Sequence, residues 1–278
     1  MIAILLAAAS AAVWGTADFA GGKAARRAPA LAVAVLSQLA SVPPLVVCLA
    51  LTADGLPRPA TLAWSAAGGL LAMIGLILLY RGLAAGAMAV VAPVTAVTAA
   101  VVPLVAGLLL DRPPGTVALI GVGCAVAAIT LVSLVPGGTR TPVTPALVGL
   151  ALTAGATFGL FFVLMSRAGT GTGLWPLAGA RIGSLALGAV LLWRTGTTLR
   201  IPTTGRYWTL AAGLLDMAAN AFYLLATHTG LLSVVAPIAS LYPASTLLLA
   251  VAVDQERVRP LQIAGLGLAA TALVLVAS

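Results

Sequence analysis

Long runs of apolar residues, separated by short polar breaks, fill the sequence from end to end. The runs lie at about 2–20, 30–52, 62–84, 88–110, 115–135, 145–165, 174–193, 207–228, 231–253 and 259–277. A helix needs about 20 mostly apolar residues to cross the hydrocarbon core of a bilayer. The runs are continuous rather than alternating, which favours helices over the strands of a barrel. The sequence therefore predicts an all-α membrane protein with about ten transmembrane helices.

The composition supports the same class of protein. Of the 278 residues, 62% are hydrophobic and 7% are charged, whereas a soluble domain is about half apolar and a quarter charged. The net charge of +8 comes from basic residues scattered through the breaks. That distribution is typical of the loops of a membrane protein and not of a nucleic-acid-binding surface. We therefore expect the lipid bilayer as a partner and no nucleic acid.

Residues that bind metals or cofactors are scarce. Cys48 and Cys124 each lie in an apolar run without a partner at metal-ligand spacing, and His228 is the single histidine. The sequence has neither a zinc motif nor a phosphate-binding loop. We expect no cofactor and no metal. An intramembrane enzyme would need a nucleophile and a base, or a metal cluster, at membrane depth. His228 falls at a helix end with no carboxylate at a recognisable spacing, so we expect that the chain is not an enzyme.

A repeated pattern relates the two halves of the chain. Val90-Val91-Ala92-Pro93 recurs 144 residues later as Val234-Val235-Ala236-Pro237. The same separation pairs Trp14 with Phe158, Gly15 with Gly159, Met73 with Met217, Gly86 with Gly230, and Gly121 with Gly265. We therefore predict two five-helix repeats, at 1–137 and 145–278. Because five is an odd number, the second repeat would enter the membrane from the opposite side, an arrangement typical of secondary transporters.

The charges in the breaks support an inverted repeat. Lys23, Arg26 and Arg27 follow the first run, whereas only Arg167 follows its counterpart, the sixth. The bias reverses for the next pair of runs: Arg58 follows the second run, and Arg194, Arg200 and Arg206 follow the seventh. The positive side of the membrane therefore stays the same in both repeats. The positive-inside rule would place both termini outside the cytoplasm.

Four short motifs stand in a fixed order along the chain. They are Trp14-Gly15, the two Val-Val-Ala-Pro segments, Ser240-Leu241-Tyr242-Pro243, and Glu256-Arg257 followed by Gln262 and Gly265. Together with the repeat, this order resembles the EamA-type transporters of the drug/metabolite transporter superfamily over nearly the whole chain. The resemblance implies two inverted five-helix units around a central cavity, in the plasma membrane, that move small metabolites or drugs.

Two features depart from that family. Asp111-Arg112 stands one residue out of register with Glu256-Arg257. The family is also usually drawn with both termini in the cytoplasm, which opposes the loop charges and leaves the orientation open.

Charged residues inside apolar runs point to a polar interior. Each costs about 2.5–3.5 kcal/mol on insertion scales and usually faces a cavity or a partner. Asp18, Arg181 and Asp216 lie in such positions, and Gly213, Asp216, Asn220, Tyr223 and Thr227 are spaced to share one helix face. The matching positions of the third run are apolar apart from Gly69, so this polar stripe belongs to the second repeat alone. We predict a substrate site of Asp216, Arg181, Asn220 and Tyr223, with Trp14 and Asp18 across from them.

Simpler structural explanations compete with this site. In one alternative, Arg181 and Asp216 form an ion pair that only locks two helices together, and the polar stripe only joins helices. In another, Asp18 sits at the membrane interface beside Lys23. For the prolines at 93, 103, 237 and 243, hinges and static kinks are both open.

The function expected from these features is secondary transport. We expect a carrier of a small-molecule substrate that works by alternating access in the plasma membrane. Proton coupling would run through Asp216 or Asp18, because intramembrane carboxylates commonly serve in proton relays. The alternative is a multi-pass membrane scaffold or receptor that transports nothing. The oligomeric state is open.

Overall fold

The structure is a computed structural model that describes residues 1–52, 57–84, 88–110, 115–133, 144–168, 173–254 and 260–277. Within these ranges the chain forms twelve helices and no strand. The helices are α1 (Ile2–Ala25), α2 (Ala30–Ala40), α3 (Val42–Thr52), α4 (Pro59–Ala84), α5 (Met88–Leu110), α6 (Thr116–Ser133), α7 (Pro145–Arg167), α8 (Trp175–Thr195), α9 (Thr203–Thr229), α10 (Leu232–Ala239), α11 (Tyr242–Asp254) and α12 (Pro260–Ala277).

The helices have the length and composition of membrane spans. In the described ranges, six helical segments are long and apolar enough to cross a bilayer: Ile2–Ala25, Ala30–Leu51, Pro59–Ala84, Pro145–Arg167, Trp175–Thr195 and Thr203–Thr229. Four shorter apolar segments are Val94–Leu110, Thr116–Leu131, Leu232–Thr246 and Pro260–Leu275. The predicted all-α membrane class is confirmed. Ten spans in two inverted repeats remain a prediction.

Two of the predicted runs are each divided into two helices. The run at 30–52 is interrupted at Ser41, between α2 and α3, and the run at 231–253 is interrupted between α10 and α11. Proline explains both interruptions, because it has no N–H to donate to the preceding turn. Pro43 and Pro44 open α3, Pro237 lies inside α10, and Pro243 lies in the first turn of α11. These two breaks were not predicted from the sequence, because the apolar character of each run continues through them.

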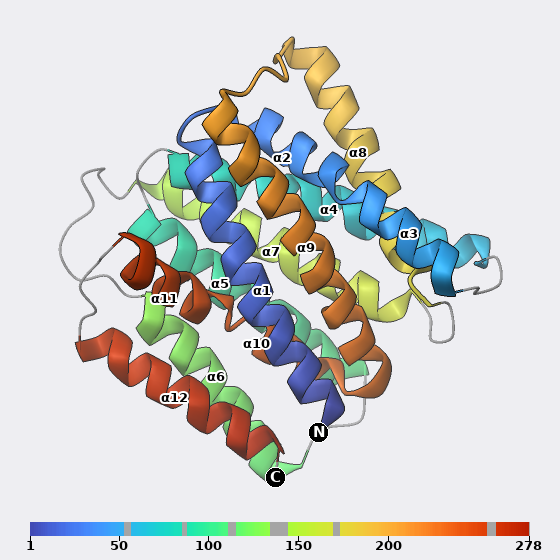
Figure 1. Cartoon of the computed structure of the whole chain (residues 1–278). Helices are drawn as coiled ribbons and strands as arrows, with labels where there is room; N and C mark the ends of the chain where they lie inside the picture. The colour runs from blue at the N-terminus through green and yellow to red at the C-terminus, as the bar shows by residue number, and fades with distance from the viewer. Residues whose placement is uncertain are drawn as a thin grey trace.

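The central helices pack lengthwise in pairs (Figure 1). α1 packs along α9, α4 along both α7 and α8, and α5 along α7. α6 and α12 pack against each other at one side of the bundle. Both termini lie at the lower edge of the view in Figure 1.

Glycines allow several of these helices to approach at backbone distance. A Cβ atom at Gly69 would lie 1.9 Å from the carbonyl oxygen of Ala180, and one at Gly213 would lie 2.0 Å from that of Ser37. Neither position therefore accepts a side chain without a shift of the neighbouring backbone. Small residues commonly permit such close packing in membrane helices. These contacts bring α8 close to α4, and α9 close to α2, around the centre of the bundle.

Some sequence features lie outside the described residues. They are Gly86, the pairs Asp111-Arg112 and Glu256-Arg257, and the breaks around Asp54 and Pro136.

Candidate functional site

A cavity lies at the centre of the bundle, lined by helices from both halves of the chain. It holds about 710 Å³ of space not filled by protein atoms, counting its opening to solvent. Its charged and amide-bearing lining residues are Asp18, Gln38, Arg181, Asp216 and Asn220. The bundle therefore has a polar interior at its centre.

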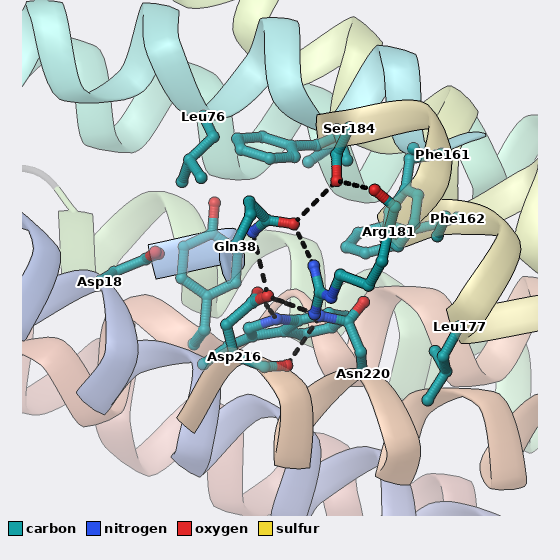
Figure 2. A pocket seen from close by; sticks show the side chains of 17 residues that line it. Asp18, Gln38, Leu76, Phe161, Phe162, Leu177, Arg181, Ser184, Asp216 and Asn220 are labelled. Atoms are coloured by element: carbon teal, nitrogen blue, oxygen red, sulfur yellow. Dashed lines mark hydrogen bonds and ion pairs between the residues drawn. The ribbon is translucent and has the colours of Figure 1, made fainter. Parts of the chain in front are cut away.

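Arg181 is the centre of the polar network (Figure 2). Its Nη2 atom lies 2.8 Å from Oδ2 of Asp216, and its Nη1 donates a hydrogen bond to Oε1 of Gln38. The residue is 7% exposed, and within the described ranges its Nε has no hydrogen-bond partner. Burial of an ionised group is tolerated only when it is paired and hydrogen-bonded, and α2 and α9 supply those partners. The predicted contact between Arg181 and Asp216 is therefore present.

Gln38 and Ser184 complete this network. Ser184 Oγ donates to Gln38 Oε1 at 3.2 Å, and Gln38 Nε2 donates to Asp216 Oδ2 at 3.3 Å. Our sequence analysis missed both residues. Gln38 is the one amide in the apolar run at 30–52, and Ser184 follows Arg181 by three residues, on the same helix face. Both signals were therefore present in the sequence.

Asp216 collects donors from four side chains. Besides Arg181 and Gln38, Trp14 Nε1 donates to its Oδ1 at 3.2 Å. Asn220 Nδ2 donates to the same oxygen at 3.0 Å and to the Asp216 carbonyl oxygen at 2.7 Å. The carboxylate therefore joins α1, α2, α8 and α9 at one point. Its side chain keeps 24% exposure towards the cavity.

Tyr223 lies behind the wall of the cavity and not in it. It is fully buried, and its hydroxyl donates to the carbonyl oxygen of Phe162 at 3.1 Å. Its ring packs 4.8 Å from that of Phe162 and 5.6 Å from that of Trp14. Of the six predicted site residues, Tyr223 is the one that does not line the cavity. It supports two aromatic side chains that do.

Asp18 also lines the cavity, one helical turn after Trp14 on α1. It makes no hydrogen bond and no ion pair with any other residue in the described part of the chain. In Figure 2, Asp18 reaches the cavity from the left and Arg181 from the right, with Gln38 between them. Lys23 lies instead over the ring of Phe19, 5.0 Å from its centroid. The cavity therefore holds one paired carboxylate and one unpaired carboxylate.

Apart from Ser184 and Gly69, apolar and aromatic side chains form the rest of the lining. They are Ala72, Leu76, Ala99, Phe158, Phe161, Phe162, Leu177, Ala180 and Tyr242, together with Trp14. In the described ranges, no group of three or more histidine, cysteine or acidic side chains is placed to hold a metal ion. A few fixed polar groups within an apolar surface are what a small-molecule binding site requires.

Comparisons with known proteins agree with this architecture. One solved crystal structure superimposes with a TM-score of 0.80 over 99% of this chain and 98% of the other, at 16% sequence identity. At that identity the likeness concerns the fold alone. No curated protein sequence matches the chain. The family model of the EamA-like transporters matches residues 1–134 and again residues 146–278. The chain therefore belongs to the EamA-like transporter family, a family of membrane transporters.

Proposed function

We propose that this chain is a secondary transporter that carries a small metabolite or drug across the plasma membrane by alternating access through the central cavity. In this proposal it has ten membrane spans, arranged as inverted repeats at 1–137 and 145–278. The broken helices count as one span each, α2 with α3 and α10 with α11. The binding residues are Asp216, Arg181, Asn220, Trp14 and Asp18, supported from behind by Tyr223.

The observation that carries the proposal is that the cavity is lined by corresponding positions of the two halves. Four pairs of lining residues are separated by 144 positions: Trp14 and Phe158, Asp18 and Phe162, Ala72 and Asp216, and Leu76 and Asn220. Gln38 with Arg181, and Ala99 with Tyr242, are separated by 143 positions. Substrate sites of inverted-repeat transporters lie at the interface between the repeats.

The helix contacts support the same symmetry. If the two halves exchange places, the contact of α1 with α9 becomes that of α7 with α4, and both are observed. The contact of α4 with α8 becomes that of α9 with α2. The close approach of Gly69 to Ala180 likewise becomes that of Gly213 to Ser37. α6 and α12 exchange with each other. A two-fold relation between the halves accounts for all of these contacts together.

Proton coupling through Asp18 or Asp216 is part of the proposal. Both carboxylates line the cavity, and a low-dielectric site favours the neutral form of a carboxylate unless a cation compensates it. Arg181 compensates Asp216. Asp18 is therefore the better candidate for taking up a proton when the cavity holds no solute.

The test begins with a thermal-shift screen of metabolites and drugs on the purified protein, because a ligand of the folded state raises its melting temperature. Hits are then followed as labelled solutes in liposomes containing the protein, with and without a pH gradient. We expect uptake that saturates with concentration and exceeds uptake by empty liposomes. Uptake that a pH gradient does not change would remove the proton coupling.

The alternative, a scaffold or receptor, predicts a different result in the same experiment. A compound bound by such a protein would raise the melting temperature of the protein, yet the protein would not move that compound into liposomes. The double variant Arg181→Gln with Asp216→Asn serves as the control for flux, because it removes both charges of the polar network and leaves neither one buried without its partner.

A further inference from the structure

We infer that the substrate is a small organic cation with a flat aromatic or apolar body, and that its positive charge binds at Asp18. This inference rests on the proposed transport function and names the chemical class of solute. It is carried by the charges and aromatic side chains of one cavity.

The charges of the cavity do not balance. Its lining contains two carboxylates, Asp18 and Asp216, and one guanidinium, Arg181. Arg181 and Asp216 neutralise each other at 2.8 Å. Asp18 is left without a hydrogen bond or an ion pair in the described part of the chain. An unpaired charge at this depth is costly, so a bound cation would relieve that cost.

The aromatic side chains of the cavity suit the body of such a cation. Trp14 lies one helical turn before Asp18 on α1. Phe158, Phe162 and Tyr242 also line the cavity. The negative faces of aromatic rings attract cations, most strongly in sites from which water is excluded. The same rings stack on flat apolar groups. A cavity with a carboxylate and aromatic walls therefore recognises both parts of an aromatic amine.

At two corresponding positions the cavity is polar on the α9 side and apolar on the α4 side. Asp216 and Asn220 line it from α9, whereas the matching positions on α4 are Ala72 and Leu76. These two α4 side chains offer neither a donor nor an acceptor. A solute with one charged end and an apolar remainder can place the remainder against α4, and a solute that is polar throughout would leave polar groups unsatisfied there.

The arginine does not create an anion site. Both of its Nη atoms are engaged, by Gln38 and by Asp216. Its Nε alone has no partner in the described ranges, and a neutral oxygen or a water molecule can accept from that single donor. An anionic solute would meet no unpaired cation among the described lining residues, and the ionised form of Asp18 would repel it.

A series of indole compounds tests the charge at constant ring size. At pH 8 a primary alkylamine stays protonated. Tryptamine is then a cation, tryptophan a zwitterion and indole-3-acetate an anion. We expect tryptamine to raise the melting temperature of the purified protein and to bind more tightly than the other two compounds. Equal or tighter binding of tryptophan or indole-3-acetate would overturn the inference, and so would a lack of binding by tryptamine.

Two variants of Asp18 locate the cation. Asp18→Asn keeps the shape of the side chain and removes its charge, and we expect it to weaken tryptamine binding by roughly 30-fold or more, as when one partner of a buried ion pair is removed. Asp18→Glu keeps the charge and should stay within roughly tenfold of the original affinity. Because Asp18 has no partner in the described part of the chain, Asp18→Asn should fold at least as stably. Unchanged tryptamine affinity in a folded Asp18→Asn protein would overturn the assignment.

Flux measurements separate this inference from the proposed function. Tryptamine that binds but does not enter liposomes would count against transport and leave the cation site standing. Tryptophan that binds better than tryptamine and enters liposomes would support transport and overturn the cation site.

Discussion

The Nη2 atom of Arg181 lies 2.8 Å from Oδ2 of Asp216, which joins α8 to α9 inside the bundle. Each of the two residues is also hydrogen-bonded to the neutral side chain of Gln38. Removal of either charge therefore leaves the other one buried, and it also disturbs an amide that serves both. This relationship makes the pair a structural element and a part of the cavity wall at the same time.

The first prediction concerns this pair. Asp216→Asn should destabilise the fold by about 3 kcal/mol, because it leaves the charge of Arg181 uncompensated. The double variant with Arg181→Gln should recover much of that loss, because no buried charge then remains. We expect the double variant to fold and to transport nothing. Thermal unfolding and liposome uptake of both single variants and the double variant provide the measurements.

Asp18→Asn is the matched control for stability only, since it removes a cavity carboxylate that has no ion pair in the described ranges. Recovery of both stability and uptake in the double variant would make Asp216 a packing residue only.

The second prediction concerns helix packing at glycine. Gly69→Ala and Gly213→Ala would each place a methyl group within about 2 Å of a backbone oxygen, at the 1.9 Å and 2.0 Å contacts described above. Each should cost about 1–3 kcal/mol, the usual range for overpacking. Gly123→Ala in α6 and Gly149→Ala in α7 are controls, because their new Cβ atoms meet nothing within 4 Å. They should be neutral or stabilising by up to about 1 kcal/mol. Equal melting temperatures in the two groups would contradict the packing described here.

The third prediction concerns topology. The connection that follows α1 should lie on the same side of the membrane as the start of α9, because basic residues cluster at both places. Single cysteines at Ala28 and at Thr203, in a background without Cys48 and Cys124, can be labelled with an impermeant reagent in intact cells and in inverted vesicles. Labelling of the two sites from opposite sides would rule out ten spans in two inverted repeats.

The fourth prediction concerns the proline inside α10. Pro237→Ala should leave the protein folded but slow its uptake of solute, because the variant restores a backbone donor next to the interruption between α10 and α11. Pro103→Ala is the control, since Pro103 lies within the continuous helix α5. Normal uptake with only a lowered melting temperature in Pro237→Ala would identify a static kink.

The sequence predicted the class of fold because the signal for a membrane helix is local. A run of apolar residues reports on each helix separately, and α4, α7 and α8 begin and end within a few residues of the expected positions. The interruptions at Ser41 and after Ala239 escaped prediction because the apolar character continues through them. Backbone hydrogen bonding sets those positions, and only the prolines record it in the sequence.

The site was predicted where a charge made a position conspicuous. Asp18, Arg181 and Asp216 stand out in apolar runs, and all three line the cavity. Helix periodicity extended the prediction to Asn220, which lines the cavity, and also to Tyr223, which packs behind the wall. Periodicity gives the face of a helix but not the depth at which a neighbour covers it. Gln38 was missed although it is the one amide in its apolar run, because its contact with Arg181 on α8 is a long-range one that local sequence patterns do not predict.

The meeting of Gln38 with Arg181 also has a consequence for how such a protein can arise. In the two-fold arrangement proposed here, they occupy equivalent places, one in each half. In a symmetric dimer of identical subunits, the same residue type would meet its own copy at this place. Two arginines there would repel each other in the membrane interior. Fusion of two gene copies into one polypeptide removes that constraint, since each copy then mutates independently. A contact between an amide and a guanidinium at this place is therefore possible in a single chain and impossible in a symmetric dimer of identical subunits.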